Sequence, residues 1–218
     1  MGTLQAVRYN ELPPTINSED VQSSHPGLRI PGLEATHVKS SPYDDFANHL
    51  TLEDLDAYSR LFALSLPSLE PVKEDYATTP WLEAFNWPIV FTRLRELCQM
   101  SGVKWQKREF YVVSFRSVRK RDADVDLVSE LDQQSHREAC ESGGLLKYWF
   151  GSCDSEMRNL ATCIWRSRED ATAGGSGPWH RRARMAAKDL YEDIEFRTHK
   201  LVVDDNATSW RLEDYTQA

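Results

Sequence analysis

The sequence predicts an α+β protein: a ferredoxin-like β-α-β-β-α-β domain with one antiparallel sheet, preceded by a helical extension. Three observations predict this fold. Residues 109–118, EFYVVSFRSV, are β-branched and aromatic on both faces, as in a strand that is covered on both sides. Apolar stripes at helical spacing follow at 124–144 and at 178–192. Between them, LLKYWFG and NLATCIWRS are two short apolar runs, which are typical of a hairpin.

Length and composition divide the chain into three parts. Its 218 residues suit one domain with an extension. Residues 1–50 hold half of the ten prolines and show little periodicity, so an extended, partly disordered arm is expected there. Residues 51–108 are expected to form the N-terminal helical extension, and residues 109–218 the ferredoxin-like domain.

Two helices are expected in the extension. Thr51–Asp54 has the pattern of a capping box, and apolar residues then recur at helical spacing, which predicts a helix over 52–65 that Pro67 stops. A second helix is expected from Trp87 to Met100, with Asn86 as its cap and Ser101-Gly102 at its end.

The domain's first helix is expected over 124–144, closed by Gly143-Gly144. Its predicted apolar stripe consists of Val125, Val128, Leu131, Ser135 and Ala139. The strands at 145–151 and 159–167 pair next. The four-stranded sheet then carries its helices on one face, and the other face needs a cover: the N-terminal helices, a second protomer or a ligand.

The second crossover begins with a capping box at Ser167–Asp170. Glycines predict a mobile loop over Ala173–Gly177, acting as a lid, before Pro178 starts the next helix. The last strand is expected over 194–205, followed by a short polar tail over 206–218.

Composition excludes several classes of protein. A net charge of −8 argues against general binding of nucleic acid, which needs a basic footprint. The sequence has no apolar run long enough to span a bilayer and no signal-peptide core, so no membrane partner and a cytoplasmic location are expected. None of the four cysteines forms a Cys-x-x-Cys pair, and buried free thiols are favoured over disulfides. No metal spacing and no haem or flavin signal is present, so no metal and no cofactor are expected.

Two histidines are the candidate catalytic residues. His180 lies in the first turn of the second helix, beside glycines, where it could act as a general acid or base. The alternative is that it caps the local loop or pairs with an acid. His136 flanks the apolar stripe of the first helix, and its alternative is a half-exposed surface position.

Aromatic residues on the paired strands are the candidate substrate-binding residues, with core packing as the alternative. Alternation places Tyr148 and Phe150 on one sheet face and Trp149 on the other. The full predicted binding set is Tyr148, Trp149, Phe150, Trp165, Trp179 and Arg181. The segment GGSGPWHRR is also compatible with a phosphate site, because glycines precede a helix start. It lacks the Gly-Lys-Ser/Thr ending of a P-loop, so a lid is the preferred interpretation.

The stretch NLATCIWRSREDA, followed by a loop, an aromatic-histidine-arginine helix start and a last strand, resembles the dimeric α/β-barrel superfamily over about residues 109–204. That superfamily includes antibiotic-biosynthesis-type monooxygenases and related cofactor-free enzymes. A longer stretch, about 50–204, resembles a family of uncharacterised fungal proteins. It includes SLPSLEPVKEDYATTPWLEAFNW, FYVVSFRS, SGGLLKYWFG and GPWHRRA.

The resemblances imply a function but do not fix it. Some fungal relatives sit among natural-product genes, which favours a cofactor-independent tailoring enzyme, a cyclase, isomerase or oxygenase, that acts on an apolar small molecule. The superfamily also implies a homodimer. The alternative is a non-catalytic protein that binds a ligand or another protein, because a fold by itself does not determine function.

Overall fold

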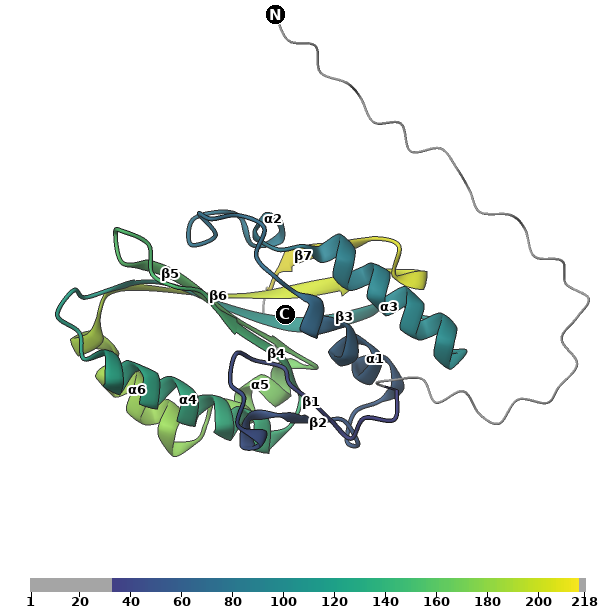
Figure 1. Ribbon diagram of the computed structural model, residues 1–218, viewed down its shortest axis with the longest axis horizontal. Coiled ribbons are helices and arrows are strands. Elements are labelled where there is room, and N and C mark those ends of the chain that lie inside the picture. The colour runs from purple at the N-terminus through teal and green to yellow at the C-terminus, as the bar shows by residue number, and fades with distance from the viewer. Residues whose placement is uncertain (1–32, 216–218) are drawn as a thin grey trace, which may run out of the picture.

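A five-stranded antiparallel sheet organises the computed structural model, which describes residues 33–215 (Figure 1). The strand order is β4-β5-β3-β6-β7. Without β7, this is the order of a ferredoxin-like sheet, in which the first strand of β-α-β-β-α-β lies between the third and the last. The predicted fold class is confirmed. The strands are β3 (Arg108–Arg119), β4 (Leu145–Phe150), β5 (Arg158–Trp165), β6 (Tyr191–Val203) and β7 (Trp210–Asp214).

Helices cover both faces of this sheet (Figure 1). On one face lie α4 (Val125–Ser142), α5 (Arg168–Gly174) and α6 (Pro178–Leu190). On the other lie α1 (Ala57–Ser65), α2 (Trp81–Ala84) and α3 (Trp87–Ser101), which share an apolar core with the sheet. The face that needed a cover is therefore covered by helices of the same chain. Short 3-10 turns occur at Phe46–Asn48, Leu66–Ser68 and Asp205–Ala207.

The two cores follow from the alternation of side chains along each strand. In β3, Phe110 and Val112 belong to the core under α1–α3, while Val113 and Phe115 pack on the α4 side. The strand is apolar on both faces because both faces are covered, as the sequence predicts.

The start of α1 differs from the prediction. Thr51 belongs to the short strand β2 (Leu50–Thr51), which pairs with β1 (His37–Val38), so it caps no helix. Asp56 caps α1 instead, since its carboxylate accepts from the amides of Tyr58 and Ser59. The helix at α3 is confirmed, and Gly102 ends it with a left-handed φ of 69°.

In α4, most of the predicted stripe is confirmed, because Leu131, Ser135 and Ala139 are buried. Val125 is the exception: it lies in the first turn and is 54% exposed. Ser167 caps α5 as predicted, accepting from the amide of Asp170.

The glycine segment is not the loop that the sequence predicts. The helix α5 continues through Gly174, which is buried. A Cβ atom at Gly174 would lie 2.3 Å from Cη2 of Trp165, so this glycine allows a close approach of helix and strand. Only a short turn separates α5 from α6, and the lid over Ala173–Gly177 is a wrong prediction.

The C-terminal residues also differ from the prediction, because they add β7 to the sheet. β7 pairs with the end of β6, with Trp210 opposite Val203. Trp210 stacks on Phe91 of α3, with ring centroids 4.3 Å apart. The sheet therefore has five strands rather than four, and Trp210 and Leu212 pack against the core under α1–α3.

Part of the predicted arm also packs on the domain, while residues 1–32 lie outside the described part. Residues 39–49, here called the strap, run along β4 and α4. The Ser40 carbonyl accepts a hydrogen bond from the amide of Tyr148 at 2.8 Å. None of the helices within residues 33–215 is long and apolar enough to cross a membrane.

Candidate functional site

The helix α4 turns a row of polar side chains toward the sheet. Asp132, Ser135 and His136 are three and four residues apart, so they share one side of the helix. Both oxygens of the Asp132 carboxylate accept hydrogen bonds from tyrosine hydroxyls: Oδ2 from Tyr43 of the strap, and Oδ1 from Tyr148 of β4. A carboxylate is thus held between three elements, the strap, the helix and the sheet.

The layer between α4 and the sheet changes the acidity of these three groups. Burial raises the pKa of Asp132, and the hydrogen bonds from Tyr148 and Tyr43 offset this only in part. A charge on His180, at the start of α6, lowers the pKa of Asp132 by a smaller amount. Burial also raises the pKa of both tyrosines, and the nearby Asp132 charge adds to it. The tyrosines therefore stay protonated as donors, and Asp132 takes up a proton at a higher pH than an exposed aspartate.

His136 belongs to the same cluster. Its Nδ1 accepts from the side-chain amide of Asn48 at 2.7 Å, which places the proton of the neutral ring on Nε2. Its ring stacks on Tyr148, with centroids 5.3 Å apart. Burial lowers the pKa of His136 to about 4, so the ring is neutral at pH 7.

Cys140 lies beside His136 but is not an activated nucleophile. Its Sγ is 3.6 Å from Nε2 of His136 and donates to the Asn48 carbonyl at 3.3 Å. Burial raises the pKa of this thiol to about 12, and the Glu141 charge adds to the effect. A thiol with that pKa remains protonated, so Cys-His chemistry is not available here.

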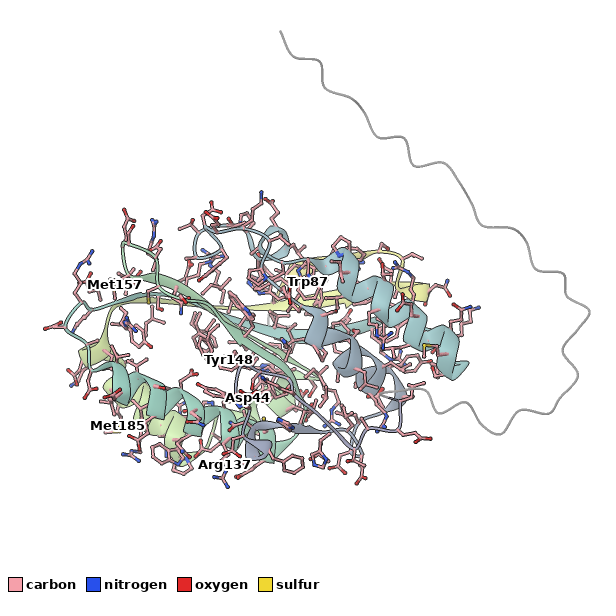
Figure 2. All side chains as sticks on the ribbon, in the orientation of Figure 1. Asp44, Trp87, Arg137, Tyr148, Met157 and Met185 are labelled. Carbon is pink, nitrogen blue, oxygen red and sulfur yellow. The ribbon has the colours of Figure 1, made fainter. Side chains whose placement is uncertain are left out.

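Apolar side chains form the floor of the layer. Phe115, Phe150, Ala161 and Cys163 point to the α4 side yet remain partly exposed. Phe196 of β6 lies against Phe115, with centroids 5.1 Å apart, and is 58% exposed. Figure 2 shows Tyr148 between the sheet and the layer of α4 and α6. Because side chains facing this layer stay partly accessible, the helices do not seal the sheet.

One buried polar atom in this layer lacks a partner. The Ser135 hydroxyl is buried on α4, three residues after Asp132, and makes no hydrogen bond with any described residue. An unsatisfied buried hydroxyl is costly unless water or a ligand pairs with it. We call Tyr43, Asp132, Ser135, His136 and Tyr148 the polar cluster.

His180 lies at the first turn of α6, outside the polar cluster, although a charge on its ring lowers the pKa of both Asp132 and His136. Its Nδ1 is 3.0 Å from Oε2 of Glu138, and the same carboxylate accepts from the amides of Trp179 and His180. Burial opposes ionisation of Glu138, but these hydrogen bonds prevail and lower its pKa. The anion site at this helix start is thus filled by Glu138, which argues against a bound phosphate.

The remaining predicted binding residues are spread over the fold. Trp149 lies on the opposite face, edge-on to Phe85, and Trp165 is buried beneath Gly174. Trp179 carries the guanidinium of Arg182 over its ring. Arg181 is exposed and donates to the Ser176 carbonyl. Of the eight predicted site residues, the structure therefore brings together His136, Tyr148 and Phe150.

Sequence reasoning missed Asp132, Ser135 as a site residue, Tyr43 and Asn48. A signal for the first existed, because Asp132 and His136 are four residues apart beside the apolar stripe. No local signal marks Tyr43 and Asn48, which lie 89 and 88 residues before their partners.

Comparison with known proteins adds a family. A family model described as PB2B2.08-like matches residues 39–214. The UPF0643 protein PB2B2.08 of Schizosaccharomyces pombe is 33% identical over 180 residues, which covers 79% of this chain and 82% of the relative. The matched region includes the strap and the whole polar cluster.

Several solved structures match less than half of this chain at low similarity. Protein SO0527 from Shewanella oneidensis is 12% identical, with a TM-score of 0.39, and covers 44% of this chain and 93% of its own. A putative antibiotic biosynthesis monooxygenase from Nitrosomonas europaea is 18% identical, with a TM-score of 0.36, over 40% of this chain and 94% of its own. SnoaB, a cofactor-independent oxygenase from Streptomyces nogalater, is 11% identical, with a TM-score of 0.34, over 42% and 90%. Similarity at this level does not extend the activity of these proteins to this chain.

Proposed function

The chain belongs to the PB2B2.08-like family, and from that premise and the polar cluster we propose that it is a cofactor-independent enzyme acting on an apolar small molecule. Asp132 is its acid–base group. The reaction is a proton transfer of the kind that isomerases and cyclases need, on a compound of natural-product type. An oxygenase would use the same proton removal and then add dioxygen to the carbanion.

One observation carries the proposal: a carboxylate held by two phenol hydroxyls in an apolar, partly accessible layer. A general base works best when its pKa approaches the working pH, and burial moves Asp132 in that direction. Ligand sites are typically apolar with a few converging polar groups, and this layer has that character.

The chemistry follows from the groups present. Ionised Asp132 takes a proton from an acidic C–H or O–H bond of the bound compound, and leaves a carbanion or oxyanion. The neutral carboxyl group then returns the proton at a second position, so atoms and charge balance. Tyr43 and Tyr148 orient the carboxylate, and the orphan Ser135 hydroxyl can donate to a ligand oxygen.

In the proposed reaction neither His136 nor His180 is the acid–base group. Neutral His136 positions Tyr148 by stacking and is fixed by Asn48. The catalytic role of His180 stays a prediction, since Glu138 holds its ring at the start of α6. A cytoplasmic location, a homodimer and the absence of a cofactor belong to the same proposal.

Hydrogen–deuterium exchange at carbon tests the proposal whatever the product of the reaction is. The protein is incubated in D₂O with a panel of apolar aromatic ketones and phenols, and deuterium at carbon is measured by mass spectrometry. We expect exchange to fall about a hundredfold in Asp132→Asn, which keeps the size of the side chain. Asp193→Asn, an exposed position on β6 outside the polar cluster, is the matched control. Undiminished exchange in Asp132→Asn would show that another group is the base.

The alternative function is ligand binding without catalysis. One observation favours it: the same hydrogen bonds fasten the strap to α4, which is a structural task. Quenching of tryptophan fluorescence by panel members, with no deuterium gained in any of them, would support this alternative and exclude the enzyme.

A further inference from the structure

The outer side of α6 carries positive charge that the chain does not neutralise. Arg181, Arg184 and Lys188 are exposed at positions i, i+3 and i+7, so they share one side of the helix. The two arginines donate to backbone carbonyls, those of Ser176 and Gly175, and no ion pair with a described carboxylate occupies any of the three. Met185 lies among them and is 75% exposed (Figure 2). We call Arg181, Arg184, Met185 and Lys188 the basic patch.

The start of α4 has the opposite character. Asp122, Asp126 and Glu130 are exposed, and none of them forms an ion pair with a cation in residues 33–215. Val125, which the sequence places on the buried stripe, is exposed among them at 54%. We call Asp122, Val125, Asp126 and Glu130 the acidic patch. Like the basic patch, it consists of charges of one sign around one exposed apolar side chain.

The two patches lie side by side on one surface. α4 and α6 pack against each other on the same face of the sheet. They run in opposite directions, because the Lys120 amide bonds to the Leu190 carbonyl at one end and Glu138 bonds to the Trp179 amide at the other. A two-fold axis that runs between the helices, parallel to them and in the plane of the contact, therefore places each basic patch on the acidic patch of another molecule. The two-fold rotation creates two identical contacts, so the basic and acidic patches of both molecules are all paired.

We propose that a second copy of this chain docks on the outer surface of α4 and α6, with the basic patch of each molecule on the acidic patch of the other. The exposed Met185 and Val125 form the apolar centre of each contact. The surrounding charges set the orientation of the two molecules. The opposite sheet face offers no route for a partner, because α1–α3 cover it. The surface is self-complementary, and this favours a second copy over an unrelated acidic protein.

Other partners fit this surface less well. A net charge of −8 repels nucleic acid and anionic lipid at long range, although the basic patch is local. The charged rim predicts a weak, salt-sensitive dimer with a dissociation constant on the order of 10 μM.

Charge swapping tests the proposal. The variant Arg181→Glu/Arg184→Glu makes both patches acidic, and Asp126→Lys/Glu130→Lys makes both basic. We expect each variant alone to be a monomer of 25.1 kDa, with dissociation constants raised at least about tenfold. A mixture of the two variants should form a heterodimer of twice that mass, because both contacts then pair opposite charges again.

Light scattering and sedimentation at about 50 mM and about 500 mM salt provide the measurement, since screening shortens the range of charge interactions. Lys104→Glu/Lys107→Glu is the matched control, with the same change of net charge at two exposed positions outside the patches. Circular dichroism verifies that each variant is folded. The proposal is overturned if the unaltered protein is monomeric at about 100 μM, if the dimer survives both charge reversals, or if the mixture stays monomeric.

Discussion

The Tyr43 hydroxyl donates a hydrogen bond to the Asp132 carboxylate across 89 residues of chain. This contact joins the strap to α4, and Tyr148 completes it from the sheet. Three elements that are distant in sequence are therefore fastened at one acidic group.

Removing the Tyr43 hydroxyl should loosen the strap. Tyr43→Phe keeps the ring but leaves one Asp132 oxygen without its donor in a partly buried site, at a cost of about 2 kcal/mol in the free energy of unfolding. Tyr76→Phe is the control, because Tyr76 donates to the Ser152 carbonyl at an exposed site and should cost less than about 1 kcal/mol. Urea unfolding measures both. Equal losses of unfolding free energy in the two variants would mean that the buried hydrogen bond from Tyr43 to Asp132 contributes no more than the exposed bond of Tyr76.

Stability should depend on pH through His136. Its pKa is about 4 in the folded chain, against 6.5 without burial. The folded state therefore favours the neutral ring, and this stability is fully present above pH 6.5 and is lost as the pH falls toward 4. The loss amounts to about 3 kcal/mol over that window. His136→Gln should remove most of this dependence in urea unfolding at pH 7.5 and 4.5, and an unchanged slope in the variant would contradict the prediction.

Asp132 should act in the opposite direction. Its folded pKa is raised by burial above the usual 3.8, so the folded state holds this proton more tightly than the unfolded chain. The corresponding stability is present below pH 3.8 and is lost as the pH rises through the raised pKa. Asp132→Asn, which cannot ionise, should therefore gain stability relative to the unaltered protein as the pH rises across that range. A constant difference between the two proteins at every pH would show that Asp132 has an ordinary pKa.

A methyl group at Gly174 should be poorly tolerated. Gly174→Ala places Cβ 2.3 Å from Cη2 of Trp165, a residue that is 4% exposed and cannot move freely. We expect a loss of about 1–3 kcal/mol, the usual cost of overpacking. At Gly175 the nearest contact is 3.1 Å, to the Ala171 carbonyl oxygen, so Gly175→Ala should cost less. Thermal unfolding compares the two, and equal melting temperatures would rule out the close packing of α5 on β5.

The order and type of the elements in the ferredoxin-like domain can be predicted from the sequence, apart from the added strand β7. Burial repeats along α4 with the period of a helix, and its apolar residues follow that repeat, whereas β3 is apolar on both faces because both faces are covered. The same reasoning placed Tyr148 and Phe150 on one face and Trp149 on the other, as the two cores confirm. The caps at Ser167 and the stop at Gly102 were also readable, because both depend on neighbours within a few residues.

The polar cluster and the cover of the sheet depend on contacts between distant residues that form only when the chain is folded. Tyr43 is an ordinary tyrosine in a proline-rich segment until the strap lies along β4 and brings its hydroxyl to Asp132. Trp210 anchors β7 only because Phe91 of α3 stands above it. Gly174 looked like a hinge because glycine permits many conformations, whereas the nearby Trp165 ring makes it a point of close contact. In each case the contacting residue is distant in sequence. The residues next to a position in the chain do not indicate which distant side chain will pack against it in the fold.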